Sequence, residues 1–399
     1  MRKLILVIVM VVFSNLVHAQ TASAPINYSN KSNITIDGKY FNSGTSGAAI
    51  YLTSCNNVVI TNCTFSLNSG IIGVQLSKCS NVEITGCYFE NVNSGVYAIN
   101  CTGGINIHCN AFKNIAGAKP RGQVVQFNTC AGAGNRINYN TLDYTYGSGN
   151  PEDLVNMYAS SGTVADPIQI IGNQFRGGGP STSGGGIMLG DNGSHDIRCE
   201  DNILVDVGQY GISAPSGYNL TIINNKVYGS KKTWTNVGIY VGLQSEITAG
   251  YTCAGSTIQV KNNLVNFTNK NGVVNGWYNC SCCSGVVQSG NDFKSTITSA
   301  VLPSDLSLNT TQCSGISTST NEIIKDQATF HLYPNPVNQQ LKISSFEVGG
   351  EILIFNTIGE VVFAGNANAE ALLIINVEHL GSGLYFVKIN NEIQKFIKE

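Results

Sequence analysis

Short stretches of alternating apolar and polar residues recur along the first three quarters of the chain. Most copies read apolar residue, two spacers, Asn, one spacer and apolar residue, as in residues 137–142 and 170–175. Ten copies occur, and the first three steps between them are 24, 24 and 23 residues. Alternation with a period of two predicts β-strands, and a repeat of this length predicts stacked coils of three short strands each.

The Asn position of the repeat lies where the chain has to bend sharply between two strands. Asn tolerates the left-handed backbone conformation of such a bend, and stacked Asn side chains can hydrogen-bond from coil to coil. Lys39, Cys63 and Cys87 take this position in three early copies. The other seven copies carry Asn110, Asn140, Asn173, Asn202, Asn225, Asn263 and Asn291. The sequence therefore predicts an asparagine ladder along one corner of the coils.

The repeats of about residues 30–295 resemble the right-handed parallel β-helix of the pectate-lyase-like superfamily. This resemblance implies an all-β protein, with a single-stranded right-handed parallel β-helix of about ten coils followed by a small C-terminal β-sandwich. It leaves the function open, because the same fold carries lyases, hydrolases, isomerases, adhesins and inert spacers.

The two ends of the chain carry export signals. Arg2 and Lys3, the apolar stretch 4–13 and the small residues before Gln20 are typical of a signal peptide. Tyr-Pro-Asn-Pro at 333–336, Phe-Asn-Thr-Ile-Gly at 355–359 and Gly-Leu-Tyr-Phe-Val-Lys at 383–388 resemble the sorting domain of the Bacteroidetes type IX secretion system. The resemblance implies that residues 329–399 engage this secretion machinery and that the protein ends up secreted or on the cell surface.

These features divide the chain into four predicted parts. We expect a signal peptide over residues 1–19, the β-helix over 20–300, an end cap with linker over 301–328, and the sorting domain over 329–399. Only 12% of the residues are charged and the net charge is −2, so no basic surface for nucleic acid is expected. No stretch is long and apolar enough for a transmembrane segment.

Thirteen cysteines in an exported chain permit disulfide bonds. Cys55, Cys79, Cys101 and Cys130 end equivalent strands of successive coils and should form one column. Such a column is compatible either with disulfides between coils or with buried thiols that act as small apolar groups. The later cysteines, namely Cys253, Cys280, Cys282, Cys283 and Cys313, are expected to pin the cap of the rod.

From the fourth coil onward one connection of each coil becomes longer. The long loops are residues 113–123, 143–154, 176–186, 205–211 and 228–238. Because they leave equivalent corners, we expect them to line one groove, where a rigid scaffold would present functional side chains.

These loops offer the residue types of two reactions on polysaccharides. A lyase needs a cation for the uronate carboxylate and a base for the C5 proton, which Lys119, Arg121, Tyr158 or Lys231 would supply. A glycosidase needs two carboxylates, for which the candidates are Glu152, Asp153, Asp191 and Asp206. The expected substrate-binding residues are Tyr144, Tyr146, Arg176, Gln209, Tyr210 and Trp234.

The sequence therefore predicts a surface or secreted protein that acts on or binds extracellular polysaccharide, with lyase chemistry favoured over hydrolysis. A non-catalytic glycan-binding or adhesin-like role is the alternative, because no catalytic signature of a known family is present. No cofactor is evident. The oxygen atoms of Asp191 and Asn192 are suited to calcium, but three residues are too few to define a site.

Overall fold

The computed structural model describes residues 20–43, 47–68, 70–243, 257–280, 283, 285–304, 306, 313, 330–344, 351–356, 360–366, 372–389 and 392–399. The chain divides into two compact units between Gly315 and Ile316. Each unit is described by itself.

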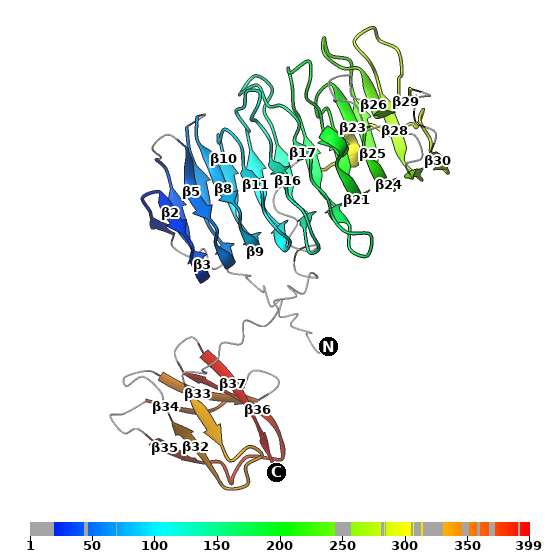
Figure 1. The fold of residues 1–399 in the computed structure, drawn as a ribbon. Helices are drawn as coiled ribbons and strands as arrows, with labels where there is room; N and C mark the ends of the chain where they lie inside the picture. Colours follow the sequence, from blue (N-terminus) through cyan, green and yellow to red (C-terminus); the bar gives the residue numbers. More distant parts are fainter. Residues whose placement is uncertain are drawn as a thin grey trace, which may run out of the picture. The chain divides into compact units, whose positions relative to one another are not determined.

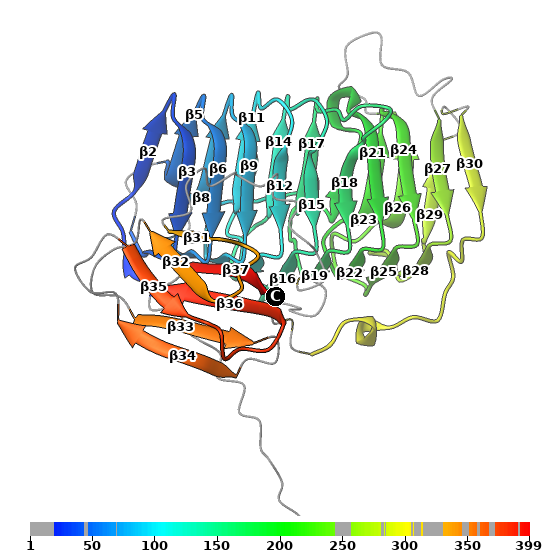
Figure 2. The same ribbon diagram turned by 90° about the horizontal axis from the view of Figure 1, so that it is seen from below.

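The first unit is a parallel β-helix built from three ten-stranded parallel sheets, as the repeat predicts (Figures 1 and 2). Each coil contributes one strand to each sheet, so every strand pairs with those three places before and after it in the chain. Sheet A contains β1 (Thr21–Ala22), β4 (Lys39–Phe41), β7 (Thr64–Ser66), β10 (Tyr88–Glu90), β13 (Ala111–Lys113), β16 (Thr141–Asp143), β19 (Gln174–Arg176), β22 (Ile203–Val205), β25 (Lys226–Gly229) and β28 (Leu264–Phe267).

The other two sheets follow the same order. Sheet B contains β2 (Ile26–Ser29), β5 (Ala48–Thr53), β8 (Ile72–Ser77), β11 (Val96–Ile99), β14 (Val125–Asn128), β17 (Val155–Tyr158), β20 (Ile187–Met188), β23 (Tyr210–Pro215), β26 (Val237–Gly242) and β29 (Trp277–Asn279). Sheet C contains β3 (Ser32–Asp37), β6 (Asn56–Thr61), β9 (Ser80–Thr85), β12 (Ile105–His108), β15 (Arg136–Asn138), β18 (Ile168–Ile171), β21 (His195–Glu200), β24 (Tyr218–Ile223), β27 (Ile258–Lys261) and β30 (Val286–Ser289). Two short 3-10 turns, η1 (Asp191–Gly193) and η2 (Ser299–Val301), also belong to this unit.

Inward side chains of equivalent strands stack along the rod and form one continuous core. In sheet A, Phe41, Phe65, Phe89 and Phe112 lie face to face, with ring centroids 5.0, 4.5 and 4.6 Å apart. The period of two in each strand places such residues inside and their neighbours outside, so the apolar pattern fixes the register.

The seven asparagines of the repeat stand in one column at the corner between sheets C and A. The side-chain amide of each of the first six donates to the side-chain oxygen of the next coil, for example Asn110 to Asn140 at 3.0 Å and Asn140 to Asn173 at 3.1 Å. The backbone N–H of each of these six donates to the same oxygen. The first six are buried, so the ladder satisfies polar groups that water does not reach.

The cysteine column holds thiols and no disulfide. Cys55, Cys79, Cys101 and Cys130 are buried and free, as are Cys63 and Cys87 at the C–A corner. Their thiols donate to backbone carbonyls, as Cys79 does to Leu52 at 3.4 Å. The buried-thiol alternative therefore describes these positions, and disulfides between these coils are absent from the structure. Burial raises the pKa of Cys87 and keeps this thiol in the unreactive protonated form at neutral pH.

The described residues after β30 run back along sheet A (Figure 2). Asn266 on β28 donates to Ile297, and η2 contacts β25. Leu302 and Leu306 pack against Val205 on β22. We call residues 295–313 the return segment, of which residues 295–304, 306 and 313 are described.

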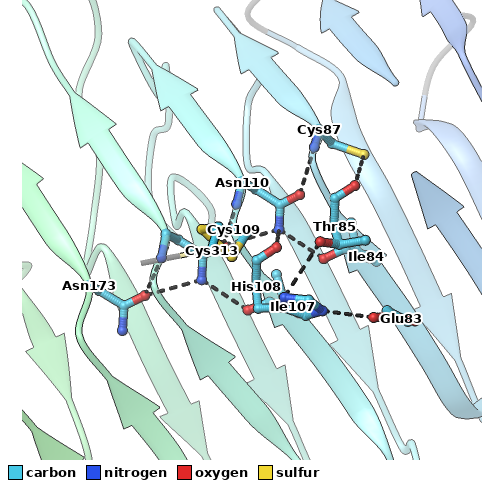
Figure 3. The surroundings of a disulfide bond; sticks show 11 residues. Glu83, Ile84, Thr85, Cys87, Ile107, His108, Cys109, Asn110, Asn173 and Cys313 are labelled. Atoms are coloured by element: carbon cyan, nitrogen blue, oxygen red, sulfur yellow. Dashed lines mark hydrogen bonds and ion pairs between the residues drawn. A yellow bond between two sulfur atoms is a disulfide. The ribbon is translucent and has the colours of Figure 1, made fainter. Parts of the chain in front are cut away.

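The return segment is fixed by the disulfide bond between Cys109 and Cys313, which joins residues 204 positions apart (Figure 3). Cys109 precedes the first asparagine of the ladder, so Cys313 lies beside the fourth coil and not at the cap. Cys280 and Cys283 each take part in a disulfide bond as well, but not with each other, since their sulfur atoms lie 4.0 Å apart. Cys253 and Cys282, the other residues expected to pin the cap, lie outside the described residues.

The second unit is a β-sandwich of two antiparallel sheets. One contains β31 (His331–Tyr333), β32 (Gln340–Ser344) and β35 (Leu372–Asn376); the other contains β34 (Val361–Asn366), β33 (Glu351–Asn356), β36 (Gly383–Ile389) and β37 (Glu392–Lys398). Leu341, Ile343, Ile354, Val387 and Phe396 fill the core between them. In neither unit do the described residues include a helix long and apolar enough to cross a membrane.

Candidate functional site

The long loops and the outer face of sheet B enclose a pocket of about 440 Å³. Its floor comes from β14, β17 and β20, whose outward side chains alternate with the core residues. Its walls come from the three loops 113–123, 143–154 and 176–186. We call it the loop pocket, and it is lined by Lys119, Pro120, Arg121, Gln123, Gln126, Asn128, Glu152, Asp153, Asn156, Tyr158, Ser183, Met188 and Asp191.

Asn156 connects the polar groups on the floor of the pocket. Its Nδ2 donates to Oδ2 of Asp153 and to Oδ2 of Asp191, both at 2.9 Å. Its Oδ1 accepts a hydrogen bond of 3.2 Å from Gln126. The two carboxylates share one amide nitrogen, so Asp153 and Asp191 are adjacent carboxyl groups, as the acid and nucleophile of a glycosidase have to be.

Asp153 is the most strongly perturbed acid of the pocket. It accepts hydrogen bonds from the hydroxyl of Tyr210 and from the N–H of Gly185 at 3.1 Å. Burial raises the pKa of Asp153 to about 7 and outweighs the opposing effect of the hydrogen bonds from Tyr210 and Asn156. Close to neutral pH this carboxyl group can therefore bind or release a proton.

Glu152 has both carboxylate oxygens engaged. Oε2 accepts a hydrogen bond from Ser181 and Oε1 accepts one from Ser183, each at 2.7 Å. Since both hydroxyls belong to the loop 176–186, Glu152 holds this wall of the pocket in place. Its role in the structure is to position the loop.

The opposite wall is cationic. The guanidinium group of Arg121 lies 3.9 Å from the ring centroid of Tyr97 and donates to Gln126 at 3.4 Å. The side chain of Lys119 is exposed at the rim. Tyr158 is 39% exposed on the floor, where its hydroxyl makes no hydrogen bond among the described residues. Positive charge and a solvent-accessible phenol thus face a network of carboxylates.

Several residues expected in the groove lie outside the pocket. Arg176 donates to the carbonyls of Pro303 and Ser304 in the return segment and pairs with Asp143 at 3.7 Å. Asp206 accepts bonds from the N–H and hydroxyl of Ser230, at 2.6 and 2.9 Å, and so stabilises a turn.

Lys231 extends toward Gly272, near the last coils, and does not line the pocket. Periodicity places a loop at a corner, but it does not determine where a long charged side chain on that loop turns.

Three residues expected to bind substrate brace the loops instead. The buried Tyr144 donates to the carbonyl of Gly149 at 2.7 Å. Tyr210 is buried against Asp153. Gln209 donates to the carbonyl of Thr182, and its own carbonyl accepts from Asn236 at 2.7 Å. The remaining two, Tyr146 and Trp234, stack on each other at the outer end of the loops.

The sequence argument missed Gln126, Asn128, Ser183 and Met188 as pocket residues. Gln126 and Met188 pair with Asn156 across sheet B. The alternation of the strands could have identified Gln126 and Met188, because each follows an inward residue of its strand and therefore has to face outward, toward the loops. Among the described residues, no three His, Cys, Asp or Glu side chains converge in an arrangement for a metal ion.

Family models match both units. Residues 9–128 match the right-handed β-helix region, and residues 331–399 match the secretion system C-terminal sorting domain. The chain is therefore a right-handed parallel β-helix protein. It ends in a sorting domain of the type IX secretion system, which implies export to the cell surface or the medium.

Solved structures with similar coils have diverse roles. They include PfbA, a surface adhesin of Streptococcus pneumoniae (16% identity, 62% of this chain and 65% of that chain, TM-score 0.41). The catalytic domain of a GH87 α-1,3-glucanase matches at 10% identity over 66% of this chain and 50% of that chain, with a TM-score of 0.39. An alginate lyase from Paenibacillus sp. str. FPU-7 matches at 12% identity over 68% and 88%, with a TM-score of 0.36. The chain thus spans less than two thirds of the first two structures, and no curated protein matches its sequence.

Proposed function

We propose that this protein binds an acidic polysaccharide in the loop pocket and cleaves it as a lyase. The observation that carries the proposal is the meeting of Lys119, Arg121 and Tyr158 in one pocket beside sheet B. A polymer of uronic acids is the ligand whose charge suits the cationic wall. Export to the surface or medium would bring the pocket to such polymers.

The reaction assigns a role to each of these groups. Arg121 and Lys119 bind the carboxylate of a uronate ring and so acidify its C5 proton. The Tyr158 hydroxyl, as phenolate, takes that proton, and the electron pair left on C5 forms the C4=C5 double bond. The bond from C4 to the bridging oxygen breaks, and this oxygen takes a proton from the acid groups held by Asn156. Asp153 suits the last step, since its pKa of about 7 leaves a proton available near neutral pH.

The test is incubation of the full chain with alginate, polygalacturonate and glycosaminoglycans. A lyase would produce the ultraviolet absorbance of a conjugated double bond together with new reducing ends. We expect Arg121→Ala and Tyr158→Phe to reduce the rate by about 10²-fold or more. Lys231→Ala is the matched control, because Lys231 is a cation on a neighbouring loop outside the pocket. Equal loss in the control variant, or no turnover of any of these polymers, would contradict the proposal.

A glycosidase is the second candidate, favoured by the pair Asp153 and Asp191. Asp153 would act as the acid and Asp191 as the nucleophile, since both carboxylates accept from one amide nitrogen and are adjacent. New reducing ends without ultraviolet absorbance, abolished by Asp191→Asn, would select this reaction. Binding without either product would select the adhesin-like alternative.

A further inference from the structure

We propose a second carbohydrate-binding site at the outer end of the loops, formed by Tyr146, Lys232, Thr233 and Trp234. We call these four residues the aromatic platform. They line a hollow of about 270 Å³ that shares no lining residue with the loop pocket. The ligand is a ring of the same acidic polysaccharide, so the ligand class rests on the proposed function, whereas cleavage is not required.

The two aromatic rings form an open stacked pair. Their centroids lie 5.5 Å apart with 16° between the ring planes, and Tyr146 is 67% exposed. A pair that only filled a gap between loops would be buried. The loops are already joined by buried groups, namely Tyr144 on Gly149 and Glu152 on the two serines. The pair, with Tyr146 exposed and Trp234 half-buried, is therefore not needed to hold the loops together.

The platform is held in a fixed geometry before any ligand arrives. Trp234 packs directly on Gly179, where a Cβ atom would lie 2.5 Å from the indole Nε1, so only glycine allows this approach. The buried Thr235 hydroxyl accepts from the N–H of Lys232 and donates to its carbonyl, both at 3.1 Å. Such preorganisation lowers the entropic cost of binding.

The side chains of the platform fit an acidic sugar. Aromatic faces offer apolar area to the C–H face of a sugar ring, and their polar ends remain in water. The ammonium group of Lys232 is exposed beside them and provides a partner for a ring carboxylate. A uronate ring has both a C–H face for the aromatic side chains and a carboxylate for the ammonium group, so it is the ligand of best charge and shape.

One loop connects the platform to the loop pocket. Gly179 lies under Trp234, and Ser183, four residues further, lines the pocket. An extended chain of this length spans at most about 14 Å. Nearby rings of one polymer can therefore occupy both sites, and simultaneous binding raises the affinity for long chains without a new contact.

Trp234 itself reports whether the platform is occupied. The chain has two tryptophans, and Trp277 lies on β29, stacked on Phe293 with centroids 5.1 Å apart. In a Trp277→Phe background, the remaining fluorescence comes from Trp234. We expect titration with oligogalacturonates to change this emission saturably, while a neutral glucan of equal length leaves it unchanged. Lys232→Ala should weaken the response about tenfold at low salt.

Two variants separate this proposal from the proposed function. Arg121→Ala disables the loop pocket, and the Trp234 response to oligogalacturonates should persist in it. Trp234→Ala, in the wild-type background, should weaken binding of long chains about tenfold or more and leave the binding of short ones in the loop pocket unaffected. If Trp277→Phe does not fold, the emission of Trp234 is obtained by subtracting the emission of the Trp234→Phe variant from that of the wild-type protein.

An emission that no acidic glycan changes would overturn the platform, even if the protein cleaves polymer. An equal response to the neutral glucan would overturn the acidic ligand class. A persistent response in a protein without turnover would retain the platform and overturn only the lyase.

Discussion

The N-terminal coils, residues 20–104, and the central coils, residues 105–243, use different side chains to hydrogen-bond the backbone at the corner between sheets C and A. In the N-terminal coils, Cys87 donates from Sγ to the carbonyls of Ile60 and Thr85, at 3.7 and 3.4 Å. In the next coil, Asn110 donates from Nδ2 to Ile84 and His108, both at 2.9 Å. The thiol reproduces the donor positions of the amide with longer and weaker bonds, and it lacks the amide's carbonyl oxygen.

This difference in side chain accompanies a difference in coil length. Steps in the N-terminal coils are 24, 24 and 23 residues. Consecutive ladder asparagines are separated by 30, 33, 29, 23, 38 and 28 residues. A column of amides that hydrogen-bond along the rod fixes this corner of each coil, whatever the length of the loop at the next corner. Loops of different length, and with them the loop pocket, can then be inserted without loss of register.

The largest effect should follow from breaking the ladder. Asn173→Ala removes the acceptor of the buried N–H of Asn140 and the two bonds that Asn173 donates, to Ile137 and Asn202. We expect a loss of about 3–5 kcal/mol in the free energy of unfolding, because buried polar groups lose their partners. Urea denaturation followed by circular dichroism measures it.

The matched variant in the N-terminal coils is Cys87→Ala, with an expected loss of about 1–2 kcal/mol. Equal losses for the two variants would remove the distinction between amide and thiol corners.

The second effect is a pH dependence of stability that arises in the central coils, from Asp153. The pKa of Asp153 is raised from 3.8 to about 7 in the folded protein. The folded state therefore binds this proton more tightly than the unfolded state, and the resulting stability is present at low pH and is lost as pH rises through 7. Between pH 4 and 8 we expect the free energy of unfolding of the wild type to fall by up to about 4 kcal/mol relative to that of Asp153→Asn, at about 1.4 kcal/mol per pKa unit.

The measurement is the urea midpoint of both proteins at several pH values. If the two curves run parallel, the proton of Asp153 is not linked to folding.

The third effect concerns the return segment. Cys313→Ser or Cys109→Ser should lower stability by about 2–4 kcal/mol, because the disulfide closes a loop of about 200 residues. We also expect faster proteolysis within residues 295–313, as judged by mass spectrometry of the fragments. The N-terminal coils carry only free thiols in the described structure, so mild reduction should leave their digestion unchanged. Unaltered cleavage of the return segment after reduction would contradict its attachment by this bond.

The smallest effect extends the ladder by one coil. Cys87→Asn places an amide next to Asn110, whose oxygen already accepts from the N–H of Cys87 at 3.0 Å. The gain should be at most about 1 kcal/mol, since one net hydrogen bond is added. Cys87→Ser is the control, because it adds a hydroxyl without an amide. A thermal midpoint lower than that of the control would mean that the N-terminal coils are too tight for the ladder.

The periodic parts of the molecule could be predicted from the sequence, and the rest could not. The asparagine column and the three sheets follow from local patterns that repeat in every coil. The contacts of Arg176 with the return segment and the Cys109–Cys313 bond join positions more than 100 residues apart, with no repeat to relate them. The sequence did predict that Lys119, Arg121 and Asp153 lie near one another, because loops that leave equivalent corners of successive coils are neighbours. It did not indicate which of their neighbours, such as Tyr210, would turn inward.

The ladder also has a direction. Every central asparagine accepts from the coil before it and donates its backbone N–H to the coil after it. A rod truncated after a central coil leaves the backbone N–H and one side-chain N–H of its asparagine without an acceptor, as the bonds from Asn140 to Asn173 show. A rod truncated before that coil leaves the side-chain oxygen and one side-chain N–H unfilled, which is one donor fewer and costs less. Growth from the N-terminal side thus always presents donors that the next coil completes. For a chain that leaves the ribosome N-terminus first, the polarity of the asparagine column matches the order in which its coils become available.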